Sequence, residues 1–236
     1  FCAGMDLSAF SNGVDDIPND KKPDHARVGE VVYRTAKELQ SYISKLEEIR
    51  VPVIAAVQGG VIGGALDLIT ACDMRFASND AFFCIQEINI GMAADVGTLQ
   101  RLPKIIPDSK MREMAYTGRR MLADEAKDSG LVGEIYETQD KMLEAVHKLA
   151  AEIASKSPVA IYGLKAVMNY SRDHNVSDSL DFNALWSGAM LSQADMTEAM
   201  TAQMEKRDAS FDKMVDVKKF NDCLLYTSDA ADDVAS

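Results

Sequence analysis

Apolar residues follow two different periods along the first half of the chain. In residues 28–49 the apolar residues recur with the spacing of one helix face, which predicts an amphipathic helix. The run 51–58, VPVIAAVQ, is compact and β-branched and stops at a Gly-Gly pair, which predicts a buried strand. Two shorter apolar runs, 74–78 and 81–85, predict two further strands joined by an Asn-Asp turn.

Helical spacing returns between and after these strands. The segment GGVIGGALDLITACD predicts a helix that its glycines open, and VGTLQRLPKII predicts one that Pro103 must limit or kink. Two short helices are expected over 109–118 and 122–130, the second ended by Gly130 in a C-cap. LVGEIYE, residues 131–137, predicts a last strand.

The second half of the chain differs, because its pattern is helical from residue 139 to about 210. Strands that alternate with helices, followed by helices alone, predict an α/β layer and then a helical region. We therefore expect an α/β core over 1–138 and a helical region over 139–212. The last fourteen residues, 223–236, carry no amphipathic pattern and resemble translated vector sequence, so we expect a non-native tail there.

The opening segment predicts a fragment. FCAGMDL reads as the end of a strand and the chain begins without Met, so we expect that upstream strands are missing. A short helix over 7–10 should follow, and then a loop over 11–26 that is rich in Asn, Gly, Asp, Pro and Lys.

Composition and charge narrow the class of protein. With 236 residues and 47% hydrophobic composition, the chain can bury a sizeable core. Its formal net charge of −12 argues against a general affinity for nucleic acid or for an anionic membrane, since phosphates need a basic surface. The longest apolar run contains Gln58, Asp67 and four glycines, so a strand, a turn and a buried helix explain it better than a membrane span.

Cysteine and histidine form no recognisable site. The four cysteines lie without CxxC pairs, as expected for reduced thiols in an intracellular compartment, and the three histidines are scattered. A zinc site or a His-dependent triad is therefore disfavoured. Carboxylates are the better candidates for the chemistry.

Three carboxylates stand among small or apolar residues, namely Asp67, Glu87 and Asp95. An unpaired buried carboxylate is costly, so each needs a reason. Asp67 could make a structural hydrogen bond, Glu87 at the end of a strand could pair with Arg75 or Arg101, and Asp95 could cap the helix that follows it. Their joint presence is harder to explain in this way and favours proton transfer away from water.

Glycines near these acids point to free backbone amides. An N–H that follows Gly in a tight turn, or one in the first turn of a helix, is unpaired and suits a developing oxyanion. AGMD offers the N–H of Met5, and GGVIGGALD offers that of Gly64. An ordinary turn is the alternative for either motif alone, and the GxGxxG order of a dinucleotide site is absent.

Three segments together resemble the crotonase, or enoyl-CoA hydratase/isomerase, superfamily: FCAGMDL, PVIAAVQGGVIGGALDLITACDMRFAS and AFFCIQEINIGMAADVGTLQRLP. The third is most similar to the delta-3,5-delta-2,4-dienoyl-CoA isomerase branch, and the likeness continues to about residue 210. The resemblance implies an α/β fold, a crotonase-like spiral of β-β-α units, with a C-terminal helical region that serves oligomerisation.

The resemblance also implies roles for the candidate residues. The N–H groups of Met5 and Gly64 would bind the thioester oxygen. Asp67 and Glu87 match the two acids of the hydratases, and Asp95, where hydratases usually have a small residue, matches a third acid of the dienoyl isomerases. No metal or redox cofactor is required.

Isomerisation of a 3,5-dienoyl thioester to its 2,4-isomer removes a proton at C2 and adds one at C6. We expect Asp95 as the base at C2 and Glu87 as the acid at C6, with the reverse assignment open, and Asp67 as an orienting or pKa-tuning acid. An apolar pocket would raise the carboxyl pKa values to permit this.

Two alternative functions are kept. An enoyl-CoA hydratase would hold water between Asp67 and Glu87, although Asp67 is shorter than the usual glutamate. An RNA-binding scaffold of the same fold would leave three acids unexplained and conflicts with the negative charge.

The Met-rich helical end could be core or a subunit interface. It contains Trp186, Met190, Met196, Met200 and Met204. The resemblance implies a homotrimer or homohexamer that acts on acyl-CoA thioesters in fatty acid β-oxidation, in the mitochondrion or the peroxisome.

Overall fold

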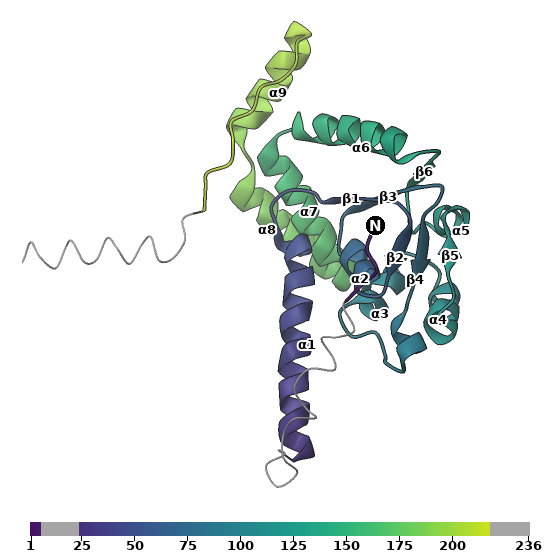
Figure 1. The fold of residues 1–236 in the computed structure, drawn as a ribbon. Helices are drawn as coiled ribbons and strands as arrows, with labels where there is room; N and C mark the ends of the chain where they lie inside the picture. Colours follow the sequence, from purple (N-terminus) through teal and green to yellow (C-terminus); the bar gives the residue numbers. More distant parts are fainter. Residues whose placement is uncertain (6–23, 218–236) are drawn as a thin grey trace, which may run out of the picture.

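The computed structural model describes residues 1–5 and 24–217 of the chain (Figure 1). The helix expected over 28–49 is α1, His25–Glu48, and it begins three residues earlier because Asp24 caps it by accepting from Arg27 N at 3.1 Å. The short helix expected over 7–10, most of the loop over 11–26 and the tail over 223–236 lie outside the described residues.

Two three-stranded sheets form the centre of the part of the chain that the structure describes. The first is parallel, in the order β1 (Ile54–Val57), β3 (Met74–Ser78), β6 (Glu134–Tyr136). The second has the order β2 (Gly60–Ile62), β4 (Phe82–Cys84), β5 (Met121–Leu122). In this second sheet β2 and β4 are parallel, whereas β4 and β5 are antiparallel.

In the first half of the chain, a strand of the first sheet is followed by a strand of the second sheet and then by a helix. β1, β2 and α2 (Gly64–Thr70) form one such unit, and β3, β4 and α3 (Thr98–Arg101) form the next. Because β1 pairs with β3 and β2 pairs with β4, the two units stack in the same direction. The predicted spiral of β-β-α units is thus confirmed.

The sequence pattern does not predict β2 or β5. β2 begins at the second glycine of one Gly-Gly pair and ends just before the next pair, and glycine disfavours a strand; it forms because its three residues pair with the three of β4. The opening segment lies along β2, where Cys2 N donates to Gly60 O at 3.0 Å and Ile62 N donates to Cys2 O at 3.2 Å. That segment is therefore extended beside a strand, as expected.

Short elements complete the first half of the chain. They are η3 (Glu87–Ile90), η4 (Leu102–Lys104), α4 (Asp108–Thr117) and α5 (Ala123–Asp128). Pro103 lies in η4, the 3-10 turn into which α3 passes, so the predicted limit is confirmed. Gly130 follows α5 with φ +85°, as expected for a glycine that ends a helix.

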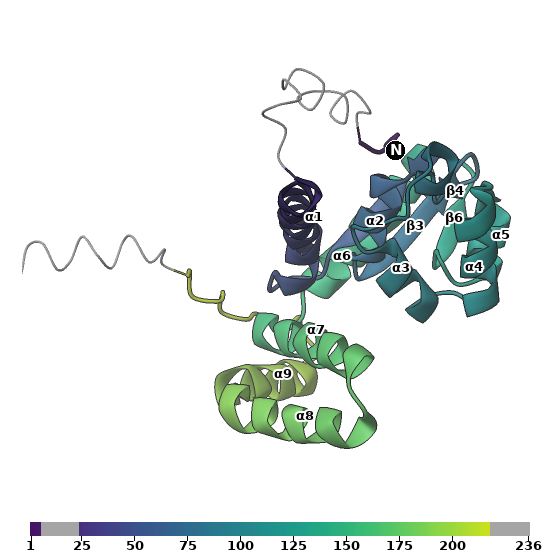
Figure 2. The same cartoon turned by 90° about the horizontal axis from the view of Figure 1, so that it is seen from below.

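The second half is helical, as predicted. Its elements are α6 (Gln139–Ala154), α7 (Pro158–Asp173), α8 (Val176–Met190) and α9 (Gln193–Glu205). The last apolar run is broken into α8 and α9, because Ser192 caps α9 by accepting from Asp195 N at 3.2 Å. Figure 2 shows α7, α8 and α9 grouped on one side, away from the strands. The domain boundaries at 138 and 212 stay a prediction.

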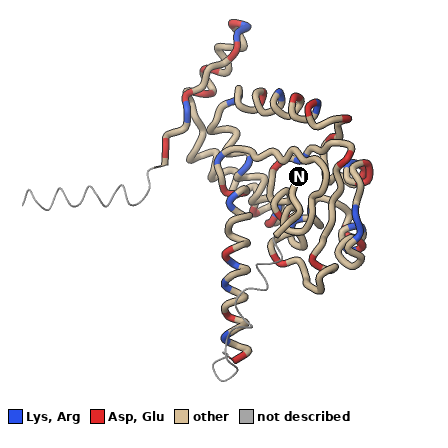
Figure 3. Tube along the Cα trace, viewed as in Figure 1, with Lys and Arg blue, Asp and Glu red and all other residues tan. Residues whose placement is uncertain are grey.

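The core and the surface are divided as the apolar pattern suggests. Val57, Leu66, Ile69 and Phe83 are fully buried and belong to one apolar cluster, which takes in strands of both sheets and α2. Positions of Lys and Arg and positions of Asp and Glu both occur along α1 and the outer helices (Figure 3). Among the helices of the described ranges, none combines the length and the apolar character that crossing a bilayer requires.

Candidate active site

Two backbone segments meet where α2 begins. Gly4 has φ +88°, and a Cβ on it would lie 2.7 Å from Ile62 O and 3.6 Å from Gly64 N, so the two backbones approach too closely for a side chain. Gly64 is the first residue of α2, and a Cβ there would meet nothing within 4 Å. The structure therefore places Met5, one residue after Gly4, beside a helix start that faces open space.

Asp67 lies in the first turn of α2 and is 1% exposed. Its Oδ1 accepts a hydrogen bond from Thr98 N at 2.5 Å, while its buried Oδ2 has no hydrogen-bond partner among the described residues. Burial raises the pKa of Asp67; hydrogen bonding to Thr98 opposes that rise, and the negative charge of Asp95 adds to it. The structural hydrogen bond considered for Asp67 is present.

Glu87 is half-buried and opens η3, three residues after β4 ends, so its expected place at the end of a strand is wrong. Its Oε1 would lie 3.1 Å from a Cβ on Gly63, which puts the carboxylate against the turn that opens α2. Burial raises the pKa of Glu87, and the charges of Asp67 and Asp95 raise it further.

Asp95 is exposed and lies in the loop between η3 and α3. The proposed N-cap is wrong, because the N-cap position of α3 is Gly97 and the first helical N–H is bonded by Asp67 instead. The Asp95 main-chain O accepts from Gln40 Nε2 of α1 at 2.7 Å. Asp95 lies three residues before Thr98, whose N–H binds Asp67, and its charge raises the pKa values of both Asp67 and Glu87; we call these three carboxylates the acid cluster.

The ion pair considered for Glu87 is not formed in the described part of the chain. Arg75 donates to the carbonyls of Cys72 and Leu131, and Arg101 binds Glu47, with 2.7 Å between Arg101 Nη2 and Glu47 Oε2. Both arginines are thus engaged elsewhere, and the cluster keeps a surplus of carboxylates. This surplus of negative charge, together with burial, raises the pKa values of Asp67 and Glu87 above the ordinary carboxyl range.

Two further residues touch this cluster, Thr98 and Gln40, and neither is predicted by the sequence pattern. Thr98 could not be found by motif, because it contributes a backbone N–H. Gln40 stands on the apolar-rich side of a helix, which is a weak signal by itself. Within the described ranges no group of His, Cys, Asp and Glu is arranged to hold a metal ion. The expectation that no cofactor is needed stays a prediction, as do the catalytic roles.

Known proteins of similar sequence support the expected crotonase-like fold independently. The family model described as enoyl-CoA hydratase/isomerase matches residues 1–214. The chain is 46% identical over 210 residues to the mitochondrial delta(3,5)-delta(2,4)-dienoyl-CoA isomerase of Rattus norvegicus, covering 89% of this chain and 63% of the relative. It therefore spans slightly less than two thirds of that relative's length.

A plant relative and a solved structure extend the comparison. The peroxisomal delta(3,5)-delta(2,4)-dienoyl-CoA isomerase of Arabidopsis thaliana is 43% identical over 214 residues, which cover 91% of this chain and 76% of the relative. The crystal structure of an enoyl-CoA hydratase from Bacillus anthracis superposes with a TM-score of 0.76 at 28% identity, covering 89% of this chain and 76% of that one. The expected crotonase fold is confirmed.

Proposed function

Because the chain belongs to the enoyl-CoA hydratase/isomerase family of the crotonase superfamily, we propose that it converts 3,5-dienoyl-CoA to 2,4-dienoyl-CoA in fatty acid β-oxidation. The observation that carries the proposal is the third acid, Asp95, whose charge acts on both Asp67 and Glu87. Isomerisation across the five carbons from C2 to C6 needs a carboxyl group at each end of the conjugated system, and this cluster can supply both.

The proposed steps use the residues of the site as follows. Asp95 removes a proton at C2, and the electrons delocalise over the diene and the thioester oxygen. The N–H groups of Met5 and Gly64 stabilise the resulting enolate oxygen. Glu87 then gives a proton to C6. The raised pKa of Glu87 supports this direction, because the group that acts as the acid must keep its proton.

Asp67 supports the other two acids in this proposal. Its bond to Thr98 N fixes the start of α3, and its negative charge raises the pKa of Glu87. Asp67 is an orienting and tuning acid rather than one that reaches the substrate. This is the role that its burial at 1% exposure favours.

An enoyl-CoA hydratase is the second candidate, because the Bacillus anthracis structure carries that name. The observation that opposes it is Asp67, whose Oδ1 already accepts from Thr98 N and whose side chain is 1% exposed. The acid at position 95 has no task in that reaction.

Turnover of two substrates by one preparation separates the candidates. We expect the absorbance of a conjugated 2,4-dienoyl thioester to appear from 3,5-dienoyl-CoA at a rate well above the loss of the 2-enoyl-CoA chromophore by hydration. A preparation that hydrates 2-enoyl-CoA faster than it isomerises the dienoyl thioester would contradict the isomerase proposal.

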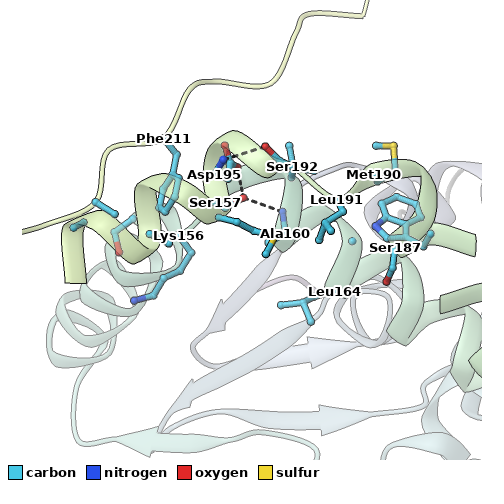
Figure 4. Close-up of a pocket in the computed structure, with 18 of the residues that line it drawn as sticks. Lys156, Ser157, Ala160, Leu164, Ser187, Met190, Leu191, Ser192, Asp195 and Phe211 are labelled. Atoms are coloured by element: carbon cyan, nitrogen blue, oxygen red, sulfur yellow. Dashed lines mark hydrogen bonds between the residues drawn. The ribbon is translucent and has the colours of Figure 1, made fainter. Parts of the chain in front are cut away.

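The helical end supports a further part of the proposal, a homotrimer or homohexamer. A cavity of about 920 Å³ lies between α7, α8, α9 and the segment after α9, and Leu164, Met190 and Leu191 border it (Figure 4). Leu191 is 66% exposed and Met204 is 76% exposed, so the Met-rich end is not core within one subunit. Exposed apolar surface of this extent is typical of an interface.

Sedimentation velocity tests the assembly. We expect the intact protein to sediment as an oligomer and Leu191→Glu to weaken it, because the charge would be buried in the interface. Leu122→Glu, on a side chain that is 64% exposed in β5, is the matched control. A stable monomer at micromolar concentration would count against the assembly.

The compartment is proposed from the names of the relatives. The rat protein is named mitochondrial and the Arabidopsis protein peroxisomal, and we infer one of these two compartments for this chain. Fractionation of the source cells with an antibody to the protein decides between them, and recovery in neither fraction contradicts the proposal.

A further inference from the structure

Helix α1 reaches the loop that carries Asp95 through one side chain. Gln40 Nε2 donates to Asp95 O at 2.7 Å across 55 positions of sequence. Lys37 Nζ donates to Gln40 Oε1 at 3.1 Å. An ammonium can only donate, so Lys37 fixes the orientation of the amide and turns its NH₂ group toward the Asp95 carbonyl.

The same face of α1 also holds the helix that follows the loop. Arg101 of α3 donates to Ser44 Oγ at 3.0 Å and to Glu47 Oε2 at 2.7 Å. Gln40, Ser44 and Glu47 are spaced four and three residues apart, which places them on one face of α1. This face is therefore docked against the loop and α3 by polar contacts.

The Asp95 loop needs such support because of its backbone. Gly91 before it has φ +77° and Gly97 after it has φ +136°, two conformations that favour glycine, so neither of these positions has a side chain that could pack and hold the loop. Ala94 is buried in the core cluster. A cavity of about 310 Å³ is lined by residues of α1, the loop and α3, among them Gln40 and Gly97, so close packing of side chains does not fill the space beside the loop.

We propose that Gln40 is a positioning residue for Asp95: by holding the Asp95 carbonyl, it keeps the Asp95 carboxylate in place beside Glu87 and the thioester. The catalytic part of this inference rests on the proposed isomerase function. Gln40 itself touches neither substrate nor reacting atoms.

The test is Gln40→Leu, which keeps the size and helical preference of the side chain and removes the donor. We expect kcat for 3,5-dienoyl-CoA to fall about tenfold, because without this hydrogen bond the Asp95 carboxylate is less often in the position that proton removal needs. KM should stay within about twofold, because the thioester is bound by other groups. Lys37→Met should lower kcat less, since it only orients the amide.

The matched control is Glu38→Leu on the same helix. Glu38 is exposed and accepts from Tyr42 of its own helix, so its replacement should leave kcat unchanged. In the Asp95→Asn background, Gln40→Leu should cause no further loss, because Gln40 acts through Asp95. An equal fractional loss in both backgrounds would mean an independent structural role and would overturn the proposal.

Hydrogen exchange tests the positioning without any substrate. Gln40→Leu should speed exchange of the Thr98 amide at the end of the loop, and Glu38→Leu should not. If Gln40→Leu does not fold, Gln40→Glu keeps the size and still cannot donate, and it should show the same two effects. Unchanged kcat and unchanged exchange overturn the role of Gln40. If the wild-type protein is inactive on 3,5-dienoyl-CoA but Gln40→Leu still speeds exchange of the Thr98 amide, only the isomerase function is contradicted and the positioning role of Gln40 stands.

Discussion

Asp67 Oδ1 accepts a hydrogen bond from Thr98 N at 2.5 Å, so a side chain of α2 caps the first turn of α3. The same carboxylate adds a negative charge beside Glu87. Asp67 thus has a mechanical effect, through the cap, and an electrostatic effect, through its charge. An amide in its place would keep the first effect and remove the second.

Asp67→Asn should therefore change the pH dependence of the reaction more than the stability. The Asn side-chain O can still accept from Thr98 N, so Tm should change little. Burial will still raise the pKa of Glu87, but loss of the Asp67 charge lowers that pKa. In the proposed mechanism Glu87 acts in its protonated form, so activity falls as the pH rises through the pKa of Glu87. In Asp67→Asn this fall should occur at a lower pH.

The measurement is kcat against pH for the wild type and Asp67→Asn. Asp67→Ala is the companion variant, because it leaves Thr98 N without its cap and should cost about 1 kcal/mol of unfolding free energy. An alkaline limb at the same pH in Asp67→Asn, with normal Tm, would show that the Asp67 charge does not tune Glu87.

Asp95→Asn should abolish most of the isomerase activity without weakening the fold. The side chain is exposed and caps no helix, so its carboxylate carries little stability. Loss of the base should lower kcat by about 10²–10⁴-fold. Asp128→Asn, at an exposed acid that ends α5, is the control and should leave the rate unchanged. Retained turnover in Asp95→Asn would remove Asp95 from the mechanism.

The elements that the sequence predicts well are those whose own apolar residues are spaced as in a helix or a strand. α1, β3 and the helices after residue 139 follow directly from apolar spacing. β2 could not be predicted in this way, because three residues between glycines become a strand only when β4 pairs with them. Glu87 was misplaced for a related reason, since β4 is shorter than its apolar run and the chain turns into η3.

In the candidate site, too, local sequence predicts the residues but not the contacts between distant segments. Asp67, Glu87 and Asp95 can be found from composition, because charged groups among apolar neighbours need an explanation. Their contacts cannot, since the Asp67–Thr98 bond spans 31 positions and the Gln40–Asp95 bond spans 55. Local patterns carry no information about pairs at such separations.

Lys165→Met should destabilise the protein strongly. Lys165 is 3% exposed, and its Nζ donates to Asp73 Oδ2 at 2.8 Å and to the carbonyls of Leu46 and Val51. Methionine removes the cation beside the Asp73 carboxylate and leaves only the hydrogen bond from Val53 N to Asp73 Oδ2, which should cost about 3–5 kcal/mol of unfolding free energy in urea. Lys127→Met breaks an exposed pair with Glu134 and should cost about 1 kcal/mol or less. Equal costs would contradict the structural role of Lys165.

Gly163→Ala should separate α7 from α8. A Cβ on Gly163 would lie 2.5 Å from Trp186 Nε1, and the Trp186 ring is held edge-on against Tyr162 with centroids 4.9 Å apart. The ring cannot yield easily, so overpacking should cost about 1–3 kcal/mol. The protein has one tryptophan, so its fluorescence reports directly on this contact.

Gly188→Ala is the control for backbone effects on the same helix pair. Gly188 lies in α8, and a Cβ there meets nothing within 4 Å. Alanine at this position should stabilise the helix by about 0.5–1 kcal/mol and leave the Trp186 emission unchanged. The two substitutions add the same methyl group, so opposite signs of the change in unfolding free energy would isolate the Gly163–Trp186 contact. Stabilisation by both would mean that α7 and α8 are not packed through Gly163.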